Sequence, residues 1–321
     1  MAAGNRTATN GAGSQGTNPP ASPVGTEVTR SPTPDPTPDP TPDPTRWTKA
    51  GDRVQDPVTS RFGTAGAASG YARSYTGSTP AARYFRSRLR LVSSTLERCP
   101  GGDLLDVGCG PGMMVRELLD LRPGDFRITA MDRSPAMVEE CLRRVEGAPD
   151  VRALVGNLEV MPFPDSSFDV VLAMGVIEYV DVAASLREIR RVLRPGALAV
   201  VTMLNPRSPY RFVEWHVHWP LLGVLRRVEA AVGVPPERWH GIADSGLRAL
   251  SERDLRMAMA AAGLAVADVV HYDVTVLVPP LDRVIRPLLA RYRDEPWERT
   301  VSSRGGRRHL GTAYLVLAHP S

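Results

Sequence analysis

The sequence predicts an α/β protein built on a doubly wound, mainly parallel β-sheet. Two observations lead to this fold class. Between residues 100 and 204, short apolar runs of strand length alternate with amphipathic segments of helical length. The first of these runs ends in a glycine-rich turn, LLDVGCGPG at 104–112. Strands that alternate with helices form βαβ units, and such units build a parallel sheet with its ligand crevice at the carboxyl ends of the strands.

The N-terminal region, residues 1–65, is predicted to be a disordered tail outside the fold. It is rich in Gly, Ser, Thr and Pro and holds three TPDP copies at 33–44. Proline at every second position removes backbone donors and fixes φ, so the repeat favours an extended, solvated spacer. The tail is either a tether or an unselective extension. We assign residues 66–321 to one domain.

The domain's elements follow in order along the chain. The segment 82–96 places Phe85, Leu89, Val92 and Leu96 on one helical face. Ser134 and Pro135 are typical of a helix N-cap and first turn. Residues 205–250 interrupt the alternation with an aromatic-rich insertion, and helices at 251–264 and 278–292 come after it. Strands are expected at 103–109, 127–132, 151–156, 168–175, 197–204, 265–273 and 310–318, with helices at 113–121, 134–145 and 185–193 between the first five.

Charge and composition narrow the functional class. The net charge is +4, yet residues 100–204 carry 16 acidic and 11 basic side chains, which argues against a concentrated nucleic-acid footprint. The sequence shows neither an apolar run of transmembrane length nor a signal-peptide pattern at its start, so we expect a cytoplasmic protein. Cys99, Cys109 and Cys141 show no C-x-x-C pairing, so neither a disulfide framework nor a metal site is expected.

The glycine turn and two aspartates predict a cofactor site. Gly108, Gly110 and Gly112 follow a strand and precede a helix, where absent side chains let the backbone approach a ligand; a plain tight turn is the alternative. Asp132, 20 residues after Gly112, ends the second strand, where an acid can accept both ribose hydroxyls or serve the following helix. Asp106 lies at the end of the first strand, where its carboxylate could either face the cofactor or simply cap nearby backbone N–H groups.

Four ordered motifs carry a resemblance to a known family. DVGCGPG, MDRS, MPFPDSSFDVV and LREIRRVLRPGAL occur in this order within residues 100–204. They resemble the successive motifs of the class I S-adenosylmethionine-dependent methyltransferases. The resemblance implies a Rossmann-like, seven-stranded sheet with an antiparallel last strand, S-adenosylmethionine as cofactor, and a helical insertion after the fifth strand, 205–250, that roofs the substrate.

The resemblance also implies roles for individual residues. The backbone around Gly108, Cys109, Gly110 and Gly112 would hold the methionine portion of the cofactor, and Asp106 would lie near its amino group. Asp132 would bind the ribose hydroxyls. The remaining implied cofactor residues are Arg133 and Met137 beside the adenine, Asn157 and Leu158 at its edge, and Met174 and Gly175 along the path to the methyl group. The family often has an acid where this chain has Asn157, so altered adenine contacts are expected.

The acceptor is less constrained by the sequence. Methyl transfer from a sulfonium needs alignment above all, and it needs a base only when the acceptor must lose a proton. The candidate bases are His216, His218, His240 and His271, with Tyr179 behind them, and none lies in a diagnostic motif. The insertion's tryptophans and leucines, flanked by arginines, favour a small apolar acceptor, anionic or prenylated, such as a lipid-like molecule or a natural product.

Several alternatives stay open at this point. Residues 211–227 could instead rest on a membrane surface, or simply pack as an added helical layer. An NAD(P)-dependent oxidoreductase would use a similar glycine turn, although its G-x-G-x-x-G pattern places the third glycine one residue later. A catalytically silent binding protein on the same scaffold is the third reading. The sequence does not determine the oligomeric state.

Overall fold

The computed structural model describes residues 63–77, 79–235, 247–285, 302–303 and 306–321. All of them belong to one compact unit, Pro42–Ser321. The TPDP repeats, nearly all of the predicted tail, His240 and residues 286–292 of the predicted helix 278–292 lie outside the described residues. Within 278–285, the described part of that helix, the helical residues are the single turn α10 (Leu281–Val284).

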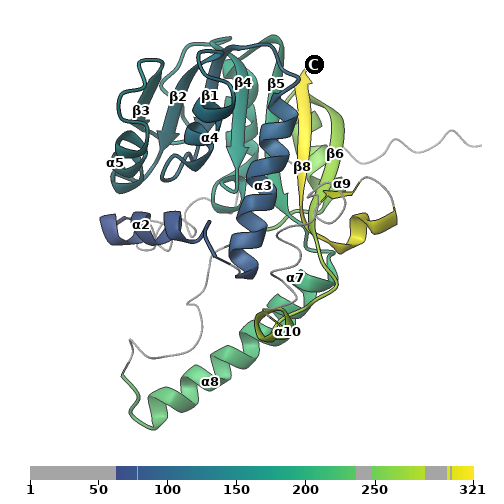
Figure 1. Cartoon of the computed structure of the whole chain (residues 1–321). Helices are drawn as coiled ribbons and strands as arrows, with labels where there is room; N and C mark the ends of the chain where they lie inside the picture. Colours follow the sequence, from purple (N-terminus) through teal and green to yellow (C-terminus); the bar gives the residue numbers. More distant parts are fainter. Residues whose placement is uncertain (1–62, 78, 236–246, 286–301, 304–305) are drawn as a thin grey trace, which may run out of the picture. The chain divides into compact units, whose positions relative to one another are not determined.

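The described strands form one sheet in the order β3-β2-β1-β4-β5-β8-β6-β7 (Figure 1). Strands β1 to β5 are parallel, and β8 runs antiparallel to both of its neighbours. The predicted seven strands with an antiparallel last strand are confirmed, and a two-residue strand, β7, is added at the edge. The bounds are β1 (Gly102–Val107), β2 (Phe126–Asp132), β3 (Val151–Val155), β4 (Phe168–Met174), β5 (Leu193–Leu204), β6 (Leu264–Val274), β7 (Ser302–Ser303) and β8 (Gly311–Pro320).

Helices cover both faces of this sheet. Successive residues of a strand point to opposite faces, so Leu104 and Leu105 of β1 enter two different cores. The core that holds Leu104 is closed by α3 (Pro80–Leu96), α4 (Met113–Leu121) and α5 (Pro135–Arg144). The core that holds Leu105 is closed by α6 (Val182–Val192) and α9 (Glu252–Ala261). The buried strands therefore read as continuous apolar runs, as expected for a sheet covered on both sides.

Local sequence signals set several helix ends. The Ser134 hydroxyl accepts the backbone N–H of Met137 at 3.3 Å, and Pro135 occupies the first turn of α5, as predicted. The Ser251 hydroxyl caps α9 in the same way. Strands β1 and β4 are neighbours in the middle of the sheet. From β1 the chain continues to β2 and β3 on one side, and from β4 it continues to β5 on the other side, so the strand order reverses between β1 and β4. This switch point opens a crevice at the carboxyl ends of the strands, beside the glycine turn.

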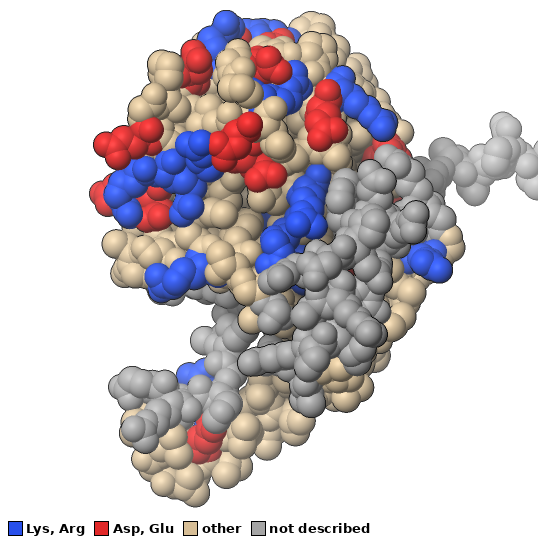
Figure 2. Space-filling view, in the orientation of Figure 1, with Lys and Arg blue, Asp and Glu red and all other residues tan. Residues whose placement is uncertain are grey.

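The insertion after β5 consists of helical segments. Helix α7 (Pro209–Val213) leads into a π-helical turn, η4 (Glu214–His218), and then into α8 (Trp219–Ala231). Helix α8 has no buried residue, and its Leu221 is 64% exposed. On the face that Figure 2 shows, the uncovered part of this segment is mostly uncharged, whereas acidic and basic side chains intermingle over the body of the sheet. The short helix α2 (Ala65–Arg73) precedes α3 and packs against α5.

Candidate active site

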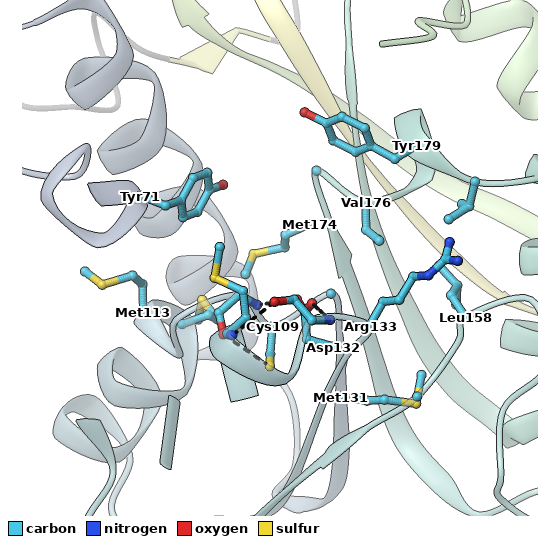
Figure 3. Close-up of a pocket in the computed structure, with 18 of the residues that line it drawn as sticks. Tyr71, Cys109, Met113, Met131, Asp132, Arg133, Leu158, Met174, Val176 and Tyr179 are labelled. Atoms are coloured by element: carbon cyan, nitrogen blue, oxygen red, sulfur yellow. Dashed lines mark hydrogen bonds between the residues drawn. The ribbon is translucent and has the colours of Figure 1, made fainter. Parts of the chain in front are cut away.

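The carboxyl ends of β1, β2 and β4 surround a cavity of about 390 Å³ (Figure 3). Ten of the twelve predicted cofactor residues line this cavity, and Asp106 and Gly112 do not. The ten come from sequence motifs up to 67 positions apart, between Gly108 and Gly175. The sheet brings them together because parallel strands end at the same edge. They are Gly108, Cys109, Gly110, Asp132, Arg133, Met137, Asn157, Leu158, Met174 and Gly175.

The glycine turn is built from left-handed backbone. Gly108, Gly110 and Gly112 have φ values of 69°, 52° and 76°, a region that side chains disfavour. A Cβ on Gly110 would meet nothing nearer than the Tyr71 ring at 3.7 Å, so this backbone faces open space in the cavity. A Cβ on Gly112 would lie 2.7 Å from Sγ of Cys141. Gly112 therefore serves the close packing of the α4 start on α5.

Asp132 anchors this turn from the next strand. Its Oδ2 accepts the backbone N–H of Gly110 and its Oδ1 that of Ser134, both at 2.9 Å. The carboxylate thus supports both the turn and the start of α5, and it also lines the cavity. Burial raises the pKa of this carboxyl, and the backbone N–H groups partly offset that rise.

Asp106 lies behind the cavity wall. It is 1% exposed, and neither of its carboxylate oxygens has a hydrogen-bond partner within the described part of the chain. Burial, reinforced by the nearby Asp132 and opposed by Arg88, raises the pKa of Asp106 to about 7. An unpartnered buried carboxylate at the end of β1 is poised to meet a cationic group. The alternative reading of Asp106 as a cap for backbone N–H groups is wrong.

A second cavity of about 520 Å³ adjoins the first. Both cavities are lined by Tyr71, Arg88, Gly175 and Tyr179, and Figure 3 shows the two tyrosines on opposite sides of the first cavity. The insertion contributes Tyr210 and Arg211 of α7, Glu214 of η4 and Leu247 to the second cavity. The expectation that 205–250 roofs a substrate site is consistent with this lining.

The sequence did not single out Arg88. Arg88 follows Phe85 by three positions and so lies on the predicted apolar face of α3. A charged residue on an apolar helix face is the sequence signal that could have identified it as a functional residue. The side chain is only 4% exposed, and Nη2 donates to the Tyr75 hydroxyl at 3.0 Å. A Cβ on Gly175, whose φ is 66°, would clash with Nη1 of Arg88, so the glycine that follows β4 makes room for the guanidinium.

The three described candidate histidines line neither cavity. His216 is exposed and stacks on Phe212 with a centroid distance of 4.7 Å. His218 is buried within the π-helical turn. His271 of β6 is buried, and burial lowers the pKa of its imidazole. Among the described residues, no three His, Cys, Asp or Glu side chains are grouped as metal ligands would be.

The fold and the site together define an α/β protein that binds a small cofactor at the switch point of its sheet. A family model for a methyltransferase domain matches residues 105–201. The chain is 32% identical over 185 residues to the ubiquinone/menaquinone biosynthesis C-methyltransferase UbiE of Geobacter sulfurreducens, covering 54% of this chain and 68% of that protein. The chain therefore belongs to the class I S-adenosylmethionine-dependent methyltransferases, whose methyl donor is S-adenosylmethionine.

Other relatives match shorter stretches. The chain is 37% identical over 124 residues to an uncharacterized 37.1 kDa protein in transposon TN4556 of Streptomyces fradiae, covering 38% of this chain and 35% of that one. It is 33% identical over 128 residues to the malonyl-[acyl-carrier protein] O-methyltransferase of Hahella chejuensis, covering 39% of this chain and 45% of that one. The chain thus spans less than half the length of these two curated relatives.

Solved structures agree on the fold. A chain of the complex between the Trm112 methyltransferase activator and a methyltransferase of Haloferax volcanii superimposes with a TM-score of 0.51 at 21% identity, covering 78% of this chain and 96% of that chain. A S-adenosylmethionine-dependent methyltransferase of Thermotoga maritima gives a TM-score of 0.51 at 19% identity, covering 79% and 95%. Over the described residues, no helix combines the length and apolar character needed to cross a membrane.

Proposed function

We propose that this protein transfers the methyl group of S-adenosylmethionine to a small apolar or lipid-like natural-product acceptor held in the second cavity. The observation that carries the proposal is the shared wall. Tyr71, Arg88, Gly175 and Tyr179 line both cavities, so a cofactor in the first and an acceptor in the second would meet across them. Holding two reactants in contact and aligned can supply most of the acceleration in such a displacement.

The residues of the first cavity fit this cofactor. The bare backbone of Gly110 leaves space for the methionine portion, flanked by Gly108 and Cys109. The unpartnered carboxylate of Asp106 lies behind it, where a ligand's ammonium group would offset the cost of its burial. Asp132, at the end of β2, lines the same cavity, where its carboxylate would accept hydrogen bonds from the ribose hydroxyls.

The adenine would lie at the far end of the first cavity. Arg133 and Met137 would flank its ring, with Asn157 and Leu158 at its edge, and Met174 and Gly175 would line the path to the methyl group. The Asn157 side-chain oxygen already accepts the backbone N–H of Glu159 at 3.1 Å, which leaves its amide donors for the adenine. When bound, the cofactor supplies an electrophilic methyl group, and the protein's task is to hold the acceptor against it.

Two relatives act, by name, on malonyl-[acyl-carrier protein] and in quinone biosynthesis. Their difference shows that one scaffold serves unlike acceptors, so we infer the acceptor from this chain's own second cavity. Its volume falls in the range of small-molecule sites, and its lining combines aromatic rings with a few charged groups.

Calorimetric titration tests the proposal. We expect heat of binding with S-adenosylmethionine and none with NAD. Asp132→Ala should weaken S-adenosylmethionine binding by about 1–3 kcal/mol, because charge-assisted hydrogen bonds to the ribose are lost. Asp120→Ala is the matched control, since Asp120 pairs with Arg116 on the exposed face of α4, and its affinity should equal that of the unmodified protein.

The outcomes separate the alternatives. Heat with NAD alone would favour the oxidoreductase. S-adenosylmethionine binding with no methyl product in cell extracts analysed by mass spectrometry would favour a silent binding protein. Unchanged affinity of the Asp132→Ala variant would show that the ribose lies elsewhere.

A further inference from the structure

We propose that the acceptor's reacting atom is an anionic oxygen, of the phenolate, enolate or carboxylate type, and that the guanidinium of Arg88 binds it. This inference rests on the proposed function and names the chemistry of its acceptor. Three features of the second cavity support it: the pairing of the arginines, the place of Arg88, and the acids that line the cavity.

Charge pairing distinguishes Arg88 from the other arginines around the cavity. Arg83 forms a two-bond pair with Asp273, its Nε lying 2.6 Å from Oδ1. Arg211 is paired with Glu214. Arg88 has no carboxylate within 4.0 Å among the described residues, and Nη2 donates only to tyrosine hydroxyls. A buried guanidinium without a carboxylate is a binding site for an anion.

The position of Arg88 fits a reacting atom. Its Nη1 lies over Gly175, at the end of β4, where the two cavities meet. Its guanidinium carbon lies 5.5 Å from the Tyr84 ring centroid and 5.2 Å from that of Phe85. Tyr84 and Phe85 line the second cavity and not the first. An oxygen bound by Arg88 would therefore belong to a molecule lying against these rings, and a planar body would stack there.

No described histidine lines the cavity, and two of its acids, Glu214 and Asp273, are held by arginines. Glu178 also lines it: one carboxylate oxygen accepts the backbone N–H of Leu204 at 3.2 Å, and the other is buried without a hydrogen-bond partner among the described residues. This unpartnered oxygen can take the proton of a bound hydroxyl and pass it to solvent. The neighbouring cation lowers the pKa of that hydroxyl, so the acceptor would ionise on binding.

The balance of the step is simple. The acceptor's O–H proton leaves to solvent as the acceptor binds, and its oxygen remains on Arg88 as an anion. A lone pair of this oxygen forms the new O–C bond to the methyl group. The S–C bond breaks with its electron pair retained by sulfur, so the negative oxygen and the positive sulfonium both become neutral.

The charge of Arg88 is balanced by groups that titrate near neutrality. Burial lowers the pKa of Arg88, but its interactions with the surrounding tyrosines outweigh this and raise that pKa well above its ordinary value. The Tyr71 and Tyr75 hydroxyls accept hydrogen bonds from Nη2 of Arg88. Two carboxyls act on it from a distance, Asp106 at the end of β1 and Glu178 after β4, and burial raises the pKa of each to about 7. Anion binding should therefore weaken as the pH rises through about 7.

The test uses 7-hydroxycoumarin, whose absorbance distinguishes phenol from phenolate, and benzoate, a second planar anion. The protein is saturated with S-adenosylhomocysteine so that the first cavity is filled. We expect the hydroxyl of bound 7-hydroxycoumarin to ionise about one pH unit lower than in solution. Arg88→Met should remove this shift and weaken both probes at least tenfold, and Arg88→Lys should restore part of it. Arg116→Met, on the exposed face of α4, should bind both probes as the unmodified protein does. Neutral 7-methoxycoumarin should bind the Arg88→Met variant and the unmodified protein with the same affinity.

Three outcomes would overturn the inference. The first is that neither anion binds to protein that does bind S-adenosylhomocysteine; this result would leave the proposed function standing. The Arg88→Met variant, shown to be folded by circular dichroism, binds the anions as well as the unmodified protein. Or Arg88→Met weakens S-adenosylmethionine but not its decarboxylated analogue and leaves the probes unaffected, which would assign the guanidinium to the cofactor's own carboxylate.

Discussion

Replacing Asp106 by Asn should change how the stability of the protein depends on pH. The pKa of Asp106 is about 7 in the folded state, against an ordinary value of 3.8. Between these values the folded state holds a proton that the unfolded state has released. The free energy of unfolding contributed by Asp106 is therefore complete below about pH 4, falls by about 1.4 kcal/mol per pH unit as the pH rises, and levels off above about pH 7.

The magnitude follows from the size of the pKa change. A rise of about three units corresponds to about 4 kcal/mol in total, of which about 3 kcal/mol falls between pH 5 and pH 7. The Asp106→Asn variant cannot titrate at this position, so its stability relative to the unmodified protein should rise by about 3 kcal/mol over that interval. A constant offset from the buried amide does not affect this difference.

Urea denaturation at a series of pH values measures the effect, because the other titrating groups largely cancel between the two proteins. Parallel stability profiles from pH 5 to pH 8 would refute the reasoning and show that Asp106 stays ionised in the fold. S-adenosylmethionine supplies the second arm. If its ammonium group neutralises Asp106, affinity should rise with pH up to about 7 in the unmodified protein and show no such rise in Asp106→Asn.

Two further predictions concern packing and surface. In urea denaturation, Gly112→Ala should lower the free energy of unfolding by about 1–3 kcal/mol more than Gly124→Ala does. Both glycines have φ near 77°, so the backbone strain is matched, but a Cβ at Gly112 would meet Cys141 whereas one at Gly124 would meet nothing within 4 Å. If α8 rests on a membrane, Leu221→Glu should reduce cosedimentation with vesicles containing anionic phosphatidylglycerol, whereas Leu142→Glu, on the exposed face of α5, should not; equal pelleting of both variants would exclude the contact.

Local signals made the sheet and its glycine turn predictable from the sequence. The apolar runs are continuous because both faces of the sheet are covered, and Ser134 with Pro135 marks the start of α5 by short-range hydrogen bonding and a fixed φ. The same locality explains why ten cofactor candidates line one cavity. Each lies at the carboxyl end of a strand or within a few residues after it, and the strand ends of a parallel sheet are neighbours in space.

The second cavity depended on contacts that no local pattern contains. Arg88 is buried because Tyr75 accepts its hydrogen bond and because Gly175, 87 positions later, leaves room for it. Similarly, the role of the insertion depends on where α7 lies against α3. The candidate histidines were chosen for their chemistry alone, and the fold places the described ones outside the two cavities. Residue type can nominate a base, but only the packing of distant elements decides what it faces.

Asp106 and Arg88 link the two cavities electrostatically. Arg88 lowers the pKa of Asp106 while burial and Asp132 raise it, so the charge on either group depends on what its neighbours bind. A ligand ammonium beside Asp106 would favour the ionised carboxylate, which in turn would reduce the field that Arg88 presents to an acceptor anion. An anion on Arg88 would oppose ionisation of Asp106 in the same way. On our proposal, cofactor and acceptor would therefore share one buried charge balance, in which the acceptor oxygen at the junction over Gly175 would be attracted both by Arg88 and by the sulfonium. Methyl transfer would neutralise the oxygen and the sulfonium together, so the product pair would lose the attraction that held the reactants in contact.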